Sequence, residues 1–211
     1  MAERSATRAG RRAGFMSVRW PALLGLAAIA LTAFGSAARA QLNINPFSQY
    51  YDNVARAAAQ NDAEQVRQLV GGGEGNPNQT DDQSRTGMHY AALNGNLQII
   101  AILIKANAKL DPVDALGDTP LHLAADENQT EAAKLLIDAG AGLDPQDKDG
   151  LTPLMIAASH GNLELVRALL AKGASPTKTD YTGRDALSWA QDGRRPAVVD
   201  AITRAEEAKG S

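Results

Sequence analysis

The chain has 211 residues, of which 4% are aromatic and none is cysteine, and its 21 lysines and arginines are nearly balanced by 24 aspartates and glutamates. This length allows one domain or two, with a core that alanine and leucine must fill because aromatic residues are so few. The absence of cysteine excludes disulfides, thiolate catalysis and cysteine-based metal sites.

Residues 1–40 have the features of an export signal. Several arginines precede an apolar run from Ala22 to Phe34, and small residues surround a cleavage position at Ala40. A membrane-spanning helix needs about 20 apolar residues, more than this run provides. We therefore expect a cleavable signal peptide; an uncleaved anchor is the alternative. The expected location is the bacterial periplasm, with secretion as the alternative.

The translation start and the export route each have two candidates. Met1 or Met16 can be the first residue. Arg11 and Arg12 with Phe15 resemble a twin-arginine signal, but Phe15 stands one residue too far away. This spacing favours the general secretory route.

Removal of the signal would leave a clearly acidic protein. Six of the basic residues and one of the acidic residues lie within residues 1–40, which leaves 15 basic and 23 acidic residues. No basic stripe survives to contact phosphates. We therefore expect no nucleic-acid partner, and no membrane association after cleavage.

The folded part is expected to begin near Tyr50. Residues 41–49 are predicted to form an extended lead-in. From there to Val70, apolar residues recur at helical spacing in two short pieces that break near Asn61. The glycine-rich stretch 71–77 ends the second piece.

Beyond this stretch the sequence repeats with a fixed period, which equals the spacing from Thr86 to Thr119. Four independent columns keep the period: Thr86, Thr119, Thr152 and Asp185; His89 and His122; Ala91, Ala124, Ala157 and Ala190; Leu103, Leu136, Leu169 and Ile202. The third, fourth and fifth units begin with a turn that has aspartate first and glycine last, at 114–117, 147–150 and 180–183. A capped helix follows, with Thr119 as the N-cap and Pro120 at the first helical position in the third unit. A second helix completes the unit, and neighbouring units bury each other's apolar faces.

These units resemble the ankyrin repeat. The resemblance is carried by 119–125, by 152–162 and by 172–174, and it covers residues 50–208. It implies an all-α repeat solenoid of stacked helix-turn-helix units with hairpin tips. Five units are expected, at about 50–80, 81–113, 114–146, 147–179 and 180–208.

Several residues depart from the family pattern. Gly87 replaces the usual proline and Ser84 the turn glycine in the second unit, and residues 185–188 replace the tetrapeptide in the last. Met155 stands where a third histidine would be, so that position keeps packing volume and loses a hydrogen-bond network. Asn107 and Asn128 replace glycines at helix ends, where a left-handed backbone is expected.

The sequence offers little chemistry for catalysis. The resemblance implies that His89 and His122 bridge a threonine hydroxyl and neighbouring backbone, while His160 is expected to be exposed at a turn. The aspartates of 144–150 lack the spacing and the final glutamate of a calcium loop. No phosphate loop or nucleophile elbow is present. We expect no cofactor, no metal and no enzymatic activity.

The resemblance implies a binding surface on the concave face and the hairpin tips. Any one of these variable residues is exposed by default, so exposure alone does not make it a contact. Trp189 is expected to cover the end of the stack. The candidate binding residues are Leu116, Asp118, Asp126 and Glu127; Asp149, Leu151, Ser159 and His160; and Tyr181, Arg184, Gln191 and Asp192.

The sequence therefore predicts an exported, monomeric protein that binds an unidentified protein partner. One alternative is a secreted effector that acts on host proteins through the same surface. Another, less favoured, is a weak hydrolase that uses His160 with Asp126 or Asp192.

Overall fold

The computed structural model describes residues 53–73 and 75–210. Within these ranges the chain forms ten helices, and the only β-pairing is an isolated bridge between Thr80 and Thr86. The predicted signal peptide and lead-in, residues 1–49, lie outside the described residues. None of the described helices is both long and apolar enough to span a membrane.

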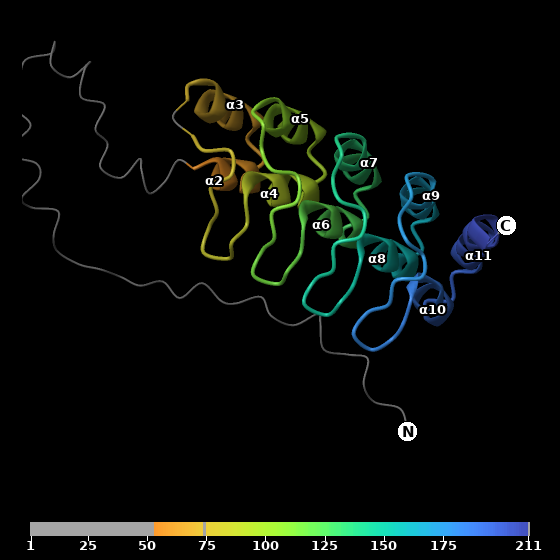
Figure 1. Ribbon diagram of the computed structural model, residues 1–211. Helices are drawn as coiled ribbons and strands as arrows, with labels where there is room; N and C mark the ends of the chain where they lie inside the picture. Colours follow the sequence, from red (N-terminus) through yellow and green to blue (C-terminus); the bar gives the residue numbers. More distant parts are fainter. Residues whose placement is uncertain (1–52, 74, 211) are drawn as a thin grey trace, which may run out of the picture. The chain divides into compact units, whose positions relative to one another are not determined.

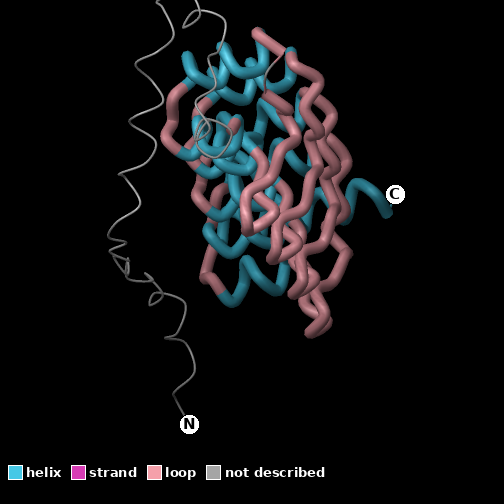
Figure 2. Tube along the Cα trace, turned by 90° about the vertical axis from the view of Figure 1, so that its left-hand side faces the viewer, coloured by secondary structure: helices cyan, strands magenta, loops and turns pink. Residues whose placement is uncertain are grey.

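The helices pack in two layers, with one inner and one outer helix in each repeat unit (Figure 1). Each helix packs on its partner and on its neighbours in the same layer. The loops between units gather along one side of the helices (Figure 2). The inner helices are α2 (Val54–Ala59), α4 (Gly87–Leu93), α6 (Pro120–Asp126), α8 (Pro153–His160) and α10 (Ala186–Asp192). The outer helices are α3 (Ala63–Gly71), α5 (Leu97–Lys105), α7 (Thr130–Asp138), α9 (Leu163–Ala171) and α11 (Pro196–Gly210).

Single residues determine where the inner helices begin and end. Thr119 is the N-cap of α6 with Pro120 in the first turn, and Asp185 caps α10 by accepting the backbone N–H of Ser188. Asn128 ends the first helix of its unit with a φ of 55°. These predictions are confirmed. In the fifth unit Arg194 takes the same left-handed backbone, with a φ of 54°.

The core is built from the repeat columns. Leu103, Leu136, Leu169 and Ile202 are fully buried on successive outer helices. Alanines at the inner-helix positions, such as Ala91 and Ala124, are buried as well and allow the inner helices to approach closely. The α11 helix, which follows the last inner helix, packs on α9 and α10.

Each hairpin tip is held by its first aspartate. In the third unit, the carboxylate of Asp114 accepts the backbone N–H groups of Leu116 and Asp118, and the Asp114 N–H donates to the Asp118 carbonyl. The same three bonds occur in every hairpin. The aspartates that make them are Asp81, Asp114, Asp147 and Asp180.

Backbone hydrogen bonds also join each tip to the next. Ala115 N donates to Gln83 O at 2.9 Å, and Tyr181 N donates to Asp149 O at 3.2 Å. At the tip of the fourth unit this close approach needs glycine: a Cβ on Gly150 would lie 2.7 Å from Tyr181 N and 2.8 Å from its ring. The tips therefore form a continuous, rigid row.

Gly150 and Gly183 form a matched pair that tests this contact. Both have a positive φ, of 81° and 85°, but a Cβ on Gly183 would meet nothing within 4 Å. Alanine at either site strains the backbone by about 1–2 kcal/mol. We expect Gly150→Ala to cost at least about 1 kcal/mol more than Gly183→Ala, because only the former crowds the next tip. Urea unfolding of both variants measures the difference; equal losses would mean that the tips do not rest on each other.

Candidate functional site

The candidate site is the surface formed by the hairpin tips and by the exposed last turns of the inner helices, called here the hairpin face. The tips contribute residues 81–85, 114–118, 147–151 and 180–184, and α6, α8 and α10 contribute their final residues. Because the tip aspartates and the row of backbone bonds fix the loops, side chains on this face project from a rigid frame. A rigid surface loses little conformational entropy when it binds.

Large apolar side chains are exposed at the tips. Leu116 is 53% exposed and Tyr181 is 71% exposed. Val113, just before the tip of the third unit, is 59% exposed and was missed by the sequence analysis. The sequence could have indicated that this position is exposed, because the corresponding residues of the next units, Gln146 and Thr179, are polar. Exposed apolar groups in a rigid setting are suited to anchor a protein partner.

Acidic residues dominate the charge of the hairpin face. Asp126 and Glu127 are exposed at the end of α6, and Asp149 is exposed at the tip of the fourth unit. Lys148 is also exposed, and its ammonium group donates to the Ala115 carbonyl of the preceding tip. The hairpin face therefore exposes more acidic than basic side chains, with Lys148 as the cation next to the third unit's tip.

Three of the predicted binding residues are placed differently from the rest. Asp118 is only 9% exposed, and its carbonyl accepts a hydrogen bond from His89. Leu151 is half-buried against the core. Gln191 lines a groove with Arg195 and Val199 of the α10–α11 segment, because its counterparts in earlier units are alanines covered by the following unit. Asp118 and Leu151 therefore offer little side-chain surface to a partner on the hairpin face, whereas Gln191 is exposed.

At the last tip the charged residues are paired. Arg184 stacks over the Trp189 ring, 3.5 Å from its centroid, and contacts Asp192 at 2.7 Å. The Trp189 indole N–H donates to Asp180 at 3.1 Å. Trp189 therefore joins α10 to its own hairpin, whereas the sequence prediction placed it over the end of the stack. Next to this cluster the Tyr181 ring stands exposed.

Ser159 and His160 do not form a catalytic arrangement. The Ser159 hydroxyl donates to the Ile156 carbonyl, and His160 Nδ1 lies 3.4 Å from the Ala125 carbonyl. His160 Nε2 is 3.8 Å from Asp126, beyond hydrogen-bond distance. His160 is half-buried and links α8 to the end of α6, rather than fully exposed as predicted. The Ser159 hydroxyl is thus bonded within α8, and His160 makes a structural contact between units.

The tip aspartates also have structural partners. The Asp147 carboxylate accepts the N–H groups of Asp149 and Leu151, so it serves the turn. Across residues 53–73 and 75–210, no group of three or more histidine, aspartate or glutamate side chains is arranged to hold a metal ion.

Comparison with known families supports this architecture. The family described as "Ankyrin repeats (3 copies)" matches residues 54–147 and again residues 139–209. The chain belongs to the ankyrin repeat family. A search of curated proteins found no match. Ankyrin repeats are generally protein–protein interaction modules, and ankyrin-repeat proteins are typically non-catalytic.

Two histidines tie the ankyrin units together. His122 Nδ1 accepts the backbone N–H of Thr119 at 3.1 Å, and Nε2 lies 3.0 Å from the Leu151 carbonyl of the next unit. His89 makes the same pair of contacts, with Thr86 and with the Asp118 carbonyl. The predicted bridging role is confirmed for both. At Met155 the ring is absent, and the Thr152 hydroxyl accepts the Met155 N–H.

Burial sets the protonation state of these rings. Burial lowers the pKa of His89 and of His122 below the ordinary value, although hydrogen bonds to the carbonyls of Asp118 and Leu151 act in the opposite direction. The neutral ring with its proton on Nε2 satisfies both contacts: Nε2–H donates to a carbonyl, and Nδ1 accepts an N–H. A second proton on Nδ1 would face a backbone donor.

Proposed function

We propose that this ankyrin-repeat protein is a non-catalytic interaction module of the bacterial periplasm that binds a protein partner through its hairpin face. The observation that carries the proposal is the pair of exposed apolar side chains, Leu116 and Tyr181, on rigid tips of a face that also exposes carboxylates. Family membership supports protein binding as the general role.

The charge of the hairpin face indicates what kind of surface would fit it. Asp126, Glu127 and Asp149 are exposed on the hairpin face, so a complementary partner carries basic side chains as well as an apolar recess for the tips. Burial of Leu116 and Tyr181 would supply most of the affinity, while the carboxylates would speed association and select the partner. Added salt should therefore slow association more than it speeds dissociation.

Removal of the two apolar anchors tests the proposal. We expect Leu116→Ser combined with Tyr181→Ser to weaken retention of the partner from a periplasmic extract by at least about tenfold, because central apolar anchors each contribute roughly 2 kcal/mol or more. Leu97→Ser is the matched control, since Leu97 is 42% exposed on the outer helix α5. Leu151 is left unchanged, because it packs against the core and its loss would disturb folding.

The measurement is the amount of each protein retained on the immobilised chain, identified by mass spectrometry. A protein retained equally by the wild type, the double variant and Leu97→Ser would show that the hairpin face does not bind it. The proposed location rests on the signal-like residues 1–40. Cell fractionation tests it: recovery from the culture medium instead of the periplasm would favour the secreted-effector alternative.

A further inference from the structure

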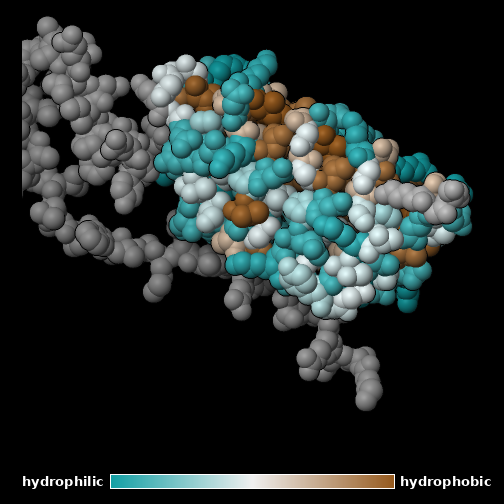
Figure 3. All heavy atoms as spheres, in the orientation of Figure 1, coloured by the Kyte–Doolittle hydropathy of each residue, from teal (hydrophilic) through white to brown (hydrophobic). Residues whose placement is uncertain are grey.

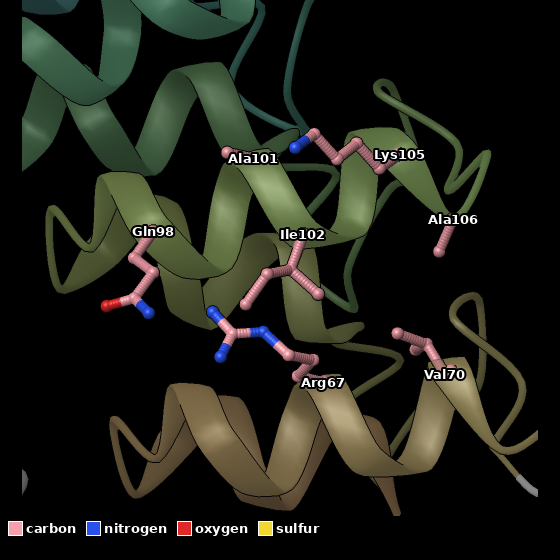
Figure 4. Close-up of a pocket in the computed structure, with 8 residues that line it drawn as sticks. Arg67, Val70, Gln98, Ala101, Ile102, Lys105 and Ala106 are labelled. Carbon is pink, nitrogen blue, oxygen red and sulfur yellow. The ribbon is translucent and has the colours of Figure 1, made fainter.

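An apolar groove lies on the outer helix layer, away from the inner helices whose ends contribute to the hairpin face. It has a volume of about 480 Å³ and runs between α3 and α5, with Val70, Ala101 and Ile102 among its apolar lining. Figure 3 shows hydrophobic residues gathered over the outer helices. In Figure 4, Arg67 reaches from α3 toward Gln98 and Ile102, while Lys105 extends along α5 beside Ala101.

The repeat supplies an internal comparison for the charged side chains beside this groove. Between α7 and α9, Lys134 of one helix contacts Glu164 of the other, and Asp138 contacts Lys172 at 2.9 Å. The positions of Lys134 and Glu164 correspond to Arg67 and Gln98 between α3 and α5. The positions of Asp138 and Lys172 correspond there to Gly71 and Ala106. Both ion pairs that join α7 and α9 are therefore absent between α3 and α5.

The substitutions leave positive charge beside the groove. Lys134 has two carboxylates near it, Glu131 on its own helix and Glu164 on the next. Arg67 has a carboxylate partner on its own helix, Glu64 at 2.8 Å. It has none on the next outer helix, because Gln98 carries no charge. Among the described residues, no ion pair involves Lys105. A carboxylate from outside would take the place that Glu164 occupies beside Lys134.

We propose that the α3–α5 groove binds an acidic amphipathic segment of a protein partner, at a site separate from the hairpin face. Apolar side chains of the segment would cover Val70 and Ile102, and its carboxylates would pair with Arg67 and Lys105. Association of this kind, an amphipathic segment laid into an apolar groove, needs apolar anchors spaced along one face of the segment. An open groove between two helices suits such a segment.

Neighbouring charges favour a protein segment over an anionic membrane. Glu64, Glu131 and Glu164 are all more than half exposed on the outer helices. A flat anionic surface would meet these carboxylates together with the groove and be repelled. A narrow segment can contact Lys105 and the Arg67 guanidinium, which Glu64 also contacts, and leave Glu131 and Glu164 in water.

The test uses a defined probe, a fluorescein-labelled peptide of about four helical turns with leucines along one face and glutamates flanking them. Its binding to the purified protein is followed by fluorescence anisotropy. The closing variant combines Gln98→Glu with Ala101→Arg, which copies Glu164 and Arg167 of α9 and leaves the net charge unchanged. We expect this variant to bind the peptide at least tenfold more weakly, and Lys105→Gln to bind it several-fold more weakly.

Three controls make the outcome decisive. The double variant Leu116→Ser and Tyr181→Ser should bind the peptide like the wild type, which separates this proposal from the one on the hairpin face. A peptide with lysines in place of the glutamates should bind at least tenfold more weakly than the acidic peptide. Urea midpoints confirm that each variant is folded. Unchanged binding by a folded closing variant, equal binding of the lysine peptide, or Lys105-dependent binding to vesicles of anionic phospholipid without peptide binding would each overturn the proposal.

Discussion

Replacing Leu136 with alanine should lower the free energy of unfolding by about 2 to 5 kcal/mol. Leu136 is fully buried on α7, in the third of five units, and α7 packs against α5, α6 and α9. Because the units stack in a row, a cavity here weakens contacts on both sides of the central unit. The measurement is urea unfolding followed by circular dichroism.

The matched control is a residue of the same row of units whose side chain faces water. Asp149→Ala should change the free energy of unfolding by no more than about 0.5 kcal/mol, since the Asp149 side chain is exposed at a tip. Equal losses from Leu136→Ala and Asp149→Ala would mean that the inward face of the outer helices has been wrongly identified.

Mild acid should destabilise the protein through His89 and His122. Because burial lowers the pKa of both rings in the folded state, the unfolded chain takes up protons first as the pH falls below about 6.5. Stability is therefore fully present above that value and is lost as the pH falls toward the folded-state pKa. Each ring contributes a slope of at most about 1.4 kcal/mol per pH unit, so the pair contributes at most about 2.7.

A natural substitution in the same chain provides the control. Met155 occupies the histidine position of the fourth unit, so the double variant His89→Met and His122→Met copies an arrangement that the protein already contains. It should lose most of the dependence of stability on pH between pH 7 and pH 5, measured by urea unfolding at each pH. An unchanged slope in this variant would assign the acid sensitivity to other groups.

Two aspartates add to acid sensitivity at lower pH. Burial opposes the ionisation of Asp114, but hydrogen bonds from Arg85 and from the backbone of Leu116 and Asp118 outweigh it and lower its pKa. Asp180 follows the same pattern. Their stabilising effect is lost only as the pH falls below the ordinary aspartate value of about 3.9. The histidine window, between pH 7 and pH 5, is therefore separate.

The fold could be predicted because its causes are local and recur with the period. Thr119 and Pro120 specify a helix start wherever they occur, and Asn107 and Asn128 take the left-handed backbone that the helix ends require. Asp147 and Gly150 likewise specify the tip between them. Each of these residues acts on backbone within a few positions of itself.

The site could be predicted only in part, because exposure depends on what the next unit covers. Gln191 stands where earlier units have alanines covered by the next inner helix, and it lines a groove with the α10–α11 segment. Asp118 is nearly buried beneath the His89 contact that joins two units. The α3–α5 groove depends on pairs such as Arg67 and Gln98, which lie on different helices of successive units. Comparing equivalent positions of the repeat one at a time does not show that an ion pair between two different positions is missing.

Photo-cross-linking in cells that produce the protein shows most directly whether a protein partner binds the hairpin face. A photoreactive residue is placed at position 116 or 181 on the hairpin face, and at position 204, an exposed site on α11, as the reference. We expect positions 116 and 181 to cross-link to the same protein and position 204 not to do so. Absence of any adduct from positions 116 and 181, or the same adduct from position 204, would contradict binding through the hairpin face.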